Sequence, residues 1–122
     1  MPTNRNITVL TSAARTATIN SDVQVNHEGS GLHIVIDVTS ITATPSVTPT
    51  IQGRDDVSGV FYDLLVGVAI TATGTTVLKV YPGITASANV SASDLLPANW
   101  RVRMVHADAD SITYSVGATV IV

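Results

Sequence analysis

β-Branched residues dominate this chain: threonine, valine and isoleucine together supply more than a third of its 122 residues. Two heavy atoms on Cβ disfavour these side chains in a helix but suit them to the pleated surface of a sheet. Charged residues make up 12% of the chain. The composition therefore predicts an all-β fold with broad, weakly polar surfaces, which suit contacts with other proteins better than catalysis.

Alternating apolar residues mark the strongest predicted strands. A period of two over residues 31–41 places every second side chain on one face of a sheet. Residues 100–107 and 112–122 show the same alternation. The predicted inward-facing side chains of the three strands are Leu32, Ile34, Ile36 and Val38; Trp100, Val102, Met104 and His106; and Ile112, Tyr114, Val116, Ala118 and Val120.

Turn-forming residues separate these strands from shorter ones. Residues 55–59 predict a hairpin connection, rich in aspartate, serine and glycine. Pro49, inside the predicted strand 46–55, indicates an edge strand or a bulge, because proline cannot donate to a β-ladder. Residues 82–99 are predicted to be the longest irregular region.

This spacing of short strands and turns, without a convincing long helix, is typical of a β-sandwich. We expect an all-β, single-domain antiparallel β-sandwich, jelly-roll-like, with seven or eight strands. Residues 15–122 are expected to form the sandwich domain. Residues 1–14 are expected to form an N-terminal arm or an edge strand.

Several classes of protein are disfavoured by the bulk properties. The net charge of -3 argues against a nucleic-acid partner, which normally requires a basic patch. The longest largely apolar stretch, residues 64–70, is too short to cross a membrane as a helix. The first residues lack an apolar run of signal-peptide length, so we expect synthesis in the cytoplasm. There is no cysteine for a disulfide or a thiolate metal site.

Candidate catalytic and metal-binding residues are sparse. His33 and His106 lie in predicted strands and could approach across a sheet, but a transition-metal site needs further ligands. Asp108 and Asp110 resemble the start of a calcium loop, yet turn formation explains them better because no bidentate carboxylate follows. No Gly-x-Ser-x-Gly elbow and no phosphate-binding loop occur in the sequence. We expect no enzyme activity, no cofactor and no metal.

Longer segments carry a resemblance that composition does not. Five of them look like parts of small structural proteins of tailed bacteriophages, and the resemblance extends over most of the chain from Ser12 onward. These segments are residues 50–55, 58–62, 75–83, 96–102 and 106–116.

The resemblance implies a head decoration (cement) protein located on the capsid surface of the virion and made in the host cytoplasm. Its partner would be the major capsid protein, and it would form a homo-oligomer, with a trimer favoured. Neither nucleic acid nor membrane would be a partner. Buried interface area would be enough for this role, since binding to the assembled shell stabilises it by mass action.

Two alternative functions remain open at this point. The chain could be a phage tail tube, adaptor or baseplate protein. It could instead be a carbohydrate-binding or adhesion module, in which Trp100 or Tyr114 would contact the sugar.

Two segments are candidates for the contact with a partner. The N-terminal segment could add a strand to a neighbouring sheet edge. The loop 82–99 could approach a neighbour closely because its residues are small. The predicted interface residues are Arg5, Ile7, Val9 and Leu10 in the first segment, and Asn89, Leu95 and Leu96 in the second.

Overall fold

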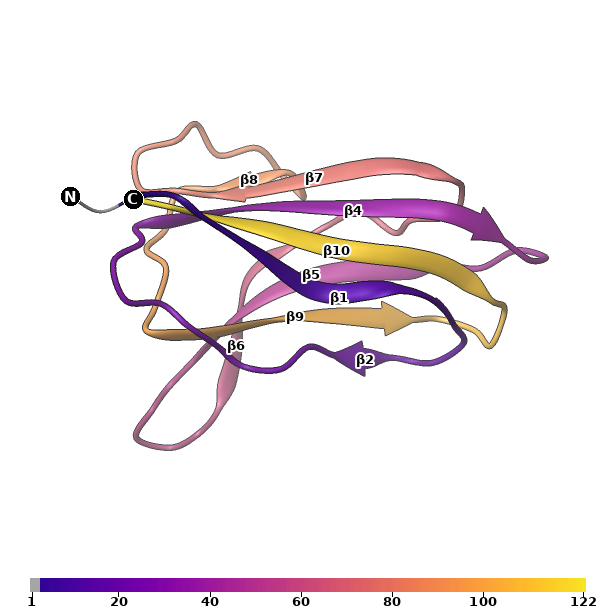
Figure 1. Cartoon of the computed structure of the whole chain (residues 1–122), viewed down its shortest axis with the longest axis horizontal. Helices are drawn as coiled ribbons and strands as arrows, with labels where there is room; N and C mark the ends of the chain where they lie inside the picture. Colours follow the sequence, from indigo (N-terminus) through magenta and orange to yellow (C-terminus); the bar gives the residue numbers. More distant parts are fainter. Residues whose placement is uncertain (1–2) are drawn as a thin grey trace.

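The computed structural model describes residues 3–122, which form ten strands and no helix (Figure 1). The strands are β1 (Arg5–Arg15), β2 (Ile19–Asn20), β3 (Gln24–Val25), β4 (Gly31–Ile41), β5 (Val47–Arg54), β6 (Phe61–Val66), β7 (Gly74–Val80), β8 (Ser91–Ala92), β9 (Asn99–His106) and β10 (Ile112–Ile121). Accordingly, no helix long and apolar enough to cross a membrane occurs in residues 3–122.

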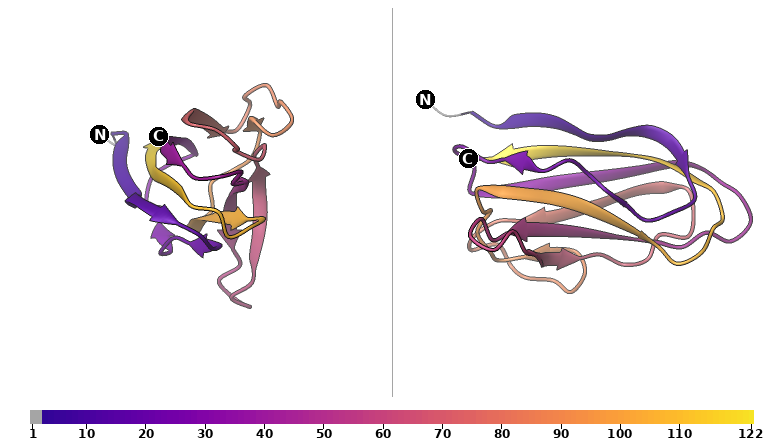
Figure 2. Two further views of the ribbon diagram at one scale, coloured as in Figure 1. Left: turned by 90° about the vertical axis from the view of Figure 1, so that its right-hand side faces the viewer. Right: turned by 90° about the horizontal axis from the view of Figure 1, so that it is seen from below.

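The strands form two facing sheets (Figure 2). The first sheet, called sheet A, has the order β1-β10-β4-β7-β8, and the second, sheet B, has the order β2-β9-β5-β6, with β3 also paired to β9. Eight strands remain when β8, which pairs in parallel, and β3, which lies off the main path of sheet B, are left out. When these eight are numbered along the chain, they lie side by side in the order 1-8-3-6 in sheet A and 2-7-4-5 in sheet B. This order is that of a jelly roll, so the predicted all-β sandwich is confirmed.

The core lies between the two sheets and is built from the predicted alternation. In β4 the residues Leu32, Ile34, Ile36 and Val38 are buried, as the period of two requires. The inward-facing residues of β10 lie beside them in sheet A, and those of β9 face them from sheet B. The largest fully buried side chains include Trp100, Tyr114, Met104, Ile112, Ile51 and Leu78. Each such side chain contributes about 1.5–3 kcal/mol through burial, so this layer carries most of the stability.

Two details differ from the expectation. The sandwich is not purely antiparallel, because β8 pairs with β7 in parallel. Strand β5 is interior, so of the two alternatives that Pro49 indicated the edge is wrong; a register shift does occur in its pairing with β6, between Ile51 and Gln52. Pro49 lies one residue beyond the point where the ladder with β6 ends, at Thr50, and its carbonyl accepts a hydrogen bond from the Gly67 amide at 2.8 Å. Its missing N–H therefore removes no bond from the ladder with β6.

The N-terminal segment belongs to the sandwich in this structure. Residues 5–15 form β1, the edge strand of sheet A, which pairs with β10. Met1 and Pro2 of the predicted arm lie outside the described residues. At the end of β1, the Arg15 guanidinium donates hydrogen bonds to the carbonyls of Thr11 and Tyr114, each at 2.6 Å. These bonds tie the last part of β1 to its neighbour.

Candidate interaction surfaces

The four edges of the two sheets differ in how well they are protected against another strand. Strand β1 is long, but two register shifts, between Thr8 and Leu10 and between Leu10 and Ala13, interrupt its pairing. Such bulges twist an edge away from a flat partner. Strands β2, β3 and β8 have two residues each, which is too short to offer a ladder. Strand β6 also carries one register shift, at Leu64, and one charged residue, Asp63, but it differs from the other edges in its exposed apolar side chains.

Strand β6 is a six-residue edge with the sequence Phe-Tyr-Asp-Leu-Leu-Val. It has neither lysine nor proline, the residues that commonly protect an edge. Of the eleven large hydrophobic residues that are exposed in residues 3–122, six lie on this strand or beside it. We call them the β6 edge surface: Val57, Val60, Tyr62, Val66, Val68 and Val90. Exposed apolar residues gathered at an open edge indicate a contact site for another chain.

The hairpin that leads into β6 is held in one conformation (lower left in Figure 1). The Asp55 carboxylate accepts hydrogen bonds from the Ser58 hydroxyl at 2.7 Å and from the Val57 amide at 3.2 Å. These bonds, the Ser58 bond first, lower the pKa of Asp55. Gly59 completes the turn with a φ of 77°. The ordered turn presents Val57 with 96% of its surface exposed.

The outer face of sheet B carries a cluster of arginines. Arg101 and Arg103 alternate with the buried residues of β9, and Arg54 follows two positions after Gln52, which lies opposite Arg101, so all three point away from the core. The Arg101 Nε donates to the Gln52 Oε1 at 2.8 Å, and the Gln52 Nε2 donates to an Asp63 carboxylate oxygen at 2.9 Å. We call Arg54, Arg101 and Arg103 the arginine face.

Arg101 is also stacked on an aromatic ring. Its Cζ lies 3.5 Å from the centroid of the Phe61 ring, a cation–π contact between β9 and β6. Burial, and after it the positive charge of Arg103, lower the pKa of Arg101. The guanidinium of Arg101 is thus held in place by Gln52 and Phe61 and lies near a second positive charge.

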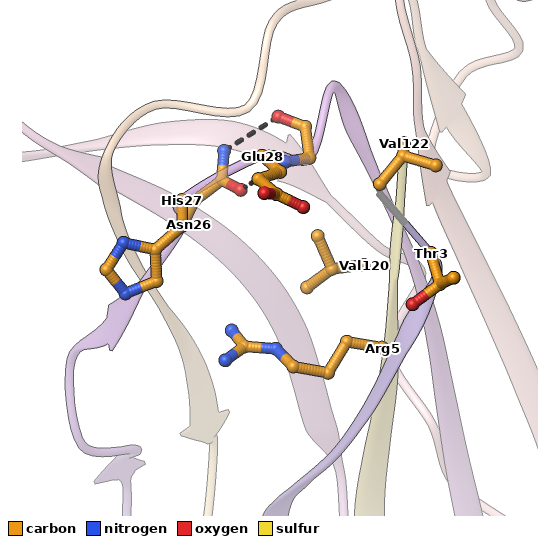
Figure 3. A pocket seen from close by; sticks show the side chains of 8 residues that line it. Thr3, Arg5, Asn26, His27, Glu28, Val120 and Val122 are labelled. Atoms are coloured by element: carbon orange, nitrogen blue, oxygen red, sulfur yellow. Dashed lines mark hydrogen bonds between the residues drawn. The ribbon is translucent and has the colours of Figure 1, made fainter. Parts of the chain in front are cut away.

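A hollow of about 200 Å³ opens where β1 begins and β10 ends (Figure 3). Asn26 closes the loop beside it, accepting a bond from the Gly29 amide and donating to the Gly29 carbonyl, both at 2.8 Å. Arg5 projects into the hollow toward His27 and Glu28. Its guanidinium donates to the Val25 carbonyl at 3.1 Å, so Arg5 joins β1 of sheet A to β3 of sheet B at this end.

A second hollow, of about 230 Å³, lies on the outer face of sheet A. Gly117 of β10 forms part of its lining, together with Val35 and His33 of β4. A Cβ atom at Gly117 would have no atom within 4 Å. The hollow therefore exists partly because this strand position lacks a side chain.

The two histidines considered as possible metal ligands are not brought together. His33 faces outward on sheet A, opposite Thr119 and Lys79, whereas His106 lies between the sheets beside Tyr114. Within the part of the chain that the structure describes, no three His, Cys, Asp or Glu side chains are placed to hold a metal.

Asp108 and Asp110 stabilise the turn in which they lie, as the turn interpretation predicts. Asp108 accepts a hydrogen bond from the Asp110 amide at 3.1 Å, and Asp110 accepts one from the Thr44 amide at 3.2 Å. Both carboxylates therefore satisfy backbone groups of this end of the sandwich.

The predicted interface residues fall into three environments. Val9 and Leu96 are buried in the core, which removes them from the accessible surface. Ile7 and Leu10 are half-buried and pack against the core. Exposed positions are held by Arg5, Asn89 and Leu95.

Asn89 lies next to the β6 edge surface. It has a φ of 62°, and its side-chain amide donates a hydrogen bond to the Val66 carbonyl at 2.9 Å. The residues of this surface were not predicted as contacts, because the sequence does not show that β6 is an edge.

Comparison with known proteins gives a structural likeness alone. No protein-family model matches the chain, and no curated protein sequence matches it. The fold is similar to a chain in the structure of infectious bursal disease virus, Gx strain, with a TM-score of 0.54 and 12% sequence identity. The likeness covers 98% of this chain and 33% of the viral chain, so this protein spans about a third of that chain's length. It shows that the two share a fold.

Proposed function

We propose that this protein is a structural component of a virus particle. The observation that carries the proposal is the likeness of almost the whole chain to a chain in the structure of infectious bursal disease virus. The jelly roll supports it further, since this fold recurs in viral capsid proteins. Lectin domains also use it, but Trp100 and Tyr114, the aromatics considered for sugar binding, are fully buried and cannot stack on a sugar.

Within the particle, we propose a decoration role on the outer capsid surface. The partner is then the major capsid protein, and the protein acts as a homo-oligomer, with a trimer favoured. The β6 edge surface supports this role because it combines the outer edge of a sheet with exposed apolar side chains. The role needs buried interface area and includes no catalytic step. Each bound copy stabilises the shell through its preference for the assembled state.

Binding to empty capsid shells of the virus tests the proposal. The purified protein is mixed with expanded shells that lack it, and co-sedimentation is measured together with the temperature at which the shells disassemble. We expect saturable binding and a higher disassembly temperature. A cryo-EM map of the saturated shells should place the chain on the outside.

Three results would overturn the proposal at different levels. Absence of the chain from native particles, measured by mass spectrometry, would exclude the virion role. Presence in purified tails and absence from heads would exclude the decoration role alone. A hexameric native mass, with no binding to shells, would favour a ring in the tail.

A further inference from the structure

The arginine face concentrates positive charge in an acidic protein. The chain has six lysines and arginines in all, against nine aspartates and glutamates. Arg54, Arg101 and Arg103, half of the basic residues, project from the same side of sheet B. The register explains this: Arg101 lies opposite Gln52 and Arg103 opposite Thr50, two residues apart on both strands. Residues two apart on a strand face the same way.

The arginine side chains are ordered against the sheet. Thr50 and Gln52 point outward, away from the core, yet they are 5% and 6% exposed. No second layer of the described chain covers this face (Figure 2). We infer that the long arginine side chains lie over these two residues, as the aliphatic part of an arginine readily does. An ordered guanidinium loses less conformational entropy when a partner binds.

Within residues 3–122, two of the three arginines have a side-chain nitrogen without a hydrogen-bond acceptor. In the described residues, the Nε atoms of Arg54 and Arg103 are buried and have no hydrogen-bond partner. Buried polar atoms in native proteins are normally paired, and an unpaired one calls for an explanation. Arg101 and Arg103 lie close enough for the charge of one to affect the pKa of the other. A negatively charged partner would relieve this repulsion.

We propose that the arginine face binds a carboxylate-rich surface of a partner protein. Guanidinium groups bind carboxylates in a planar, bidentate geometry, and stacking on Phe61 fixes the plane of one of them. Three arginines on a chain of net charge -3 favour a local acidic patch over a nucleic acid, whose extended phosphate backbone the rest of the chain repels. The identity of the partner as a capsid protein rests on the proposed function. The preference of the arginine face for carboxylates does not.

Binding of a capped hexaglutamate peptide, followed by NMR of the ¹⁵N-labelled protein at low salt, tests the proposal. We expect the amide signals of residues 52–54 and 101–103 to move and the effect to fade as salt is added. The variant Arg101→Gln/Arg103→Gln should bind the peptide at least about tenfold more weakly, as loss of paired charges at an interface predicts. The control Arg5→Gln/Lys79→Gln removes the same charge elsewhere and should bind as the wild type does. Thermal unfolding checks that both variants fold.

Other outcomes would overturn the proposal. Equal weakening in both double variants would show that net charge alone attracts the peptide. Stronger binding of a dT12 oligonucleotide at the same residues would assign the face to nucleic acid. Concentration-dependent self-association that Arg101→Gln/Arg103→Gln abolishes, without peptide binding by the wild type, would assign it to a second copy. Failure of the wild type to bind shells while the peptide binds would refute the proposed function and leave this inference standing.

Discussion

The Nε2 atom of His106 lies 2.9 Å from the hydroxyl of Tyr114, and this contact joins β9 of sheet B to β10 of sheet A. The Tyr114 side chain is fully buried. On its ring, the Arg15 Cζ lies 4.6 Å from the centroid, so an arginine of the edge strand β1 completes the group. One tyrosine thus connects the edge strand, the core and the opposite sheet.

This group makes stability depend on pH. Burial, as the largest cause, and the charge of Arg15 lower the pKa of His106, while Asp108 partly opposes them. The folded state therefore binds a proton less readily than the unfolded state, whose histidine has a pKa near 6.5. The free energy of unfolding should fall as the pH drops below about 6.5 and level off below the folded-state pKa.

Urea denaturation between pH 5 and 8 measures this effect, with His106→Gln as the comparison. The variant should lose the part of the pH dependence that lies between pH 5 and 6.5. The replacement His33→Gln, at an outward-facing position, should keep it. An unchanged pH profile in the His106 variant would refute the assignment.

Removing the Tyr114 hydroxyl should destabilise the fold. Burial raises the pKa of Tyr114 to about 12, so the hydroxyl keeps its proton across the physiological range. In Tyr114→Phe, the His106 Nε2 loses its partner inside the protein, which costs about 1–3 kcal/mol. A double-mutant cycle with His106→Gln, measured by urea denaturation, should give a clear coupling energy. Additive effects of the two substitutions would contradict a direct interaction.

The sequence predicts the long strands well because burial on one face requires a visible alternation. Strand 31–41 has the predicted bounds, and the hairpin at 55–59 is where glycine and aspartate place it. The two-residue strand β8 could not be predicted, because its pairing with β7 defines it rather than any pattern of its own. Pro49 was interpreted as a mark of an edge or a bulge, because the sequence does not show where the ladder with β6 stops.

The candidate surfaces were less predictable than the fold. Arg101 and Arg103 share a face by their spacing alone, and the sequence shows this. Arg54 joins them because β5 pairs with β9 in the folded chain, and the sequence does not show this pairing. Likewise, Val9 has the same chemistry as an exposed contact residue, and only the packing of β1 against the core shows that it is buried.

Two glycines should respond in opposite ways to replacement by alanine. A Cβ at Gly31 would collide with the Val80 carbonyl oxygen and the Tyr81 ring. We expect Gly31→Ala to destabilise the protein by about 1–3 kcal/mol through this overlap. Gly117→Ala enters open space in a strand and should stabilise by about 0.5–1 kcal/mol, because alanine loses less backbone entropy on folding. Thermal unfolding of both variants measures these changes in stability. Equal changes in the two variants would contradict the packing described for Gly31.

Arg15 should hold the end of β1 in place. In Arg15→Met the aliphatic stem remains, but the bonds to the Thr11 and Tyr114 carbonyls are lost. We expect a loss of about 1.5–3 kcal/mol in the free energy of unfolding, as for hydrogen bonds to a charged group. Hydrogen exchange should rise at residues 11–15 and stay unchanged in β4. A uniform rise over the whole chain would show that Arg15 supports global rather than local stability.

A lysine on the β6 edge surface should suppress association with another chain. Val66 and Val122 are 39% and 37% exposed, so they offer a matched pair of valines, one beside the open edge and one at the end of the chain. Lysine protects natural edge strands, because adding a strand beside it would bury its charge. Val66→Lys should therefore weaken shell binding and raise the protein concentration at which aggregation begins, whereas Val122→Lys should change neither. Co-sedimentation with shells and light scattering measure the two effects. If Val122→Lys acts as strongly as Val66→Lys, added positive charge rather than the open edge controls association.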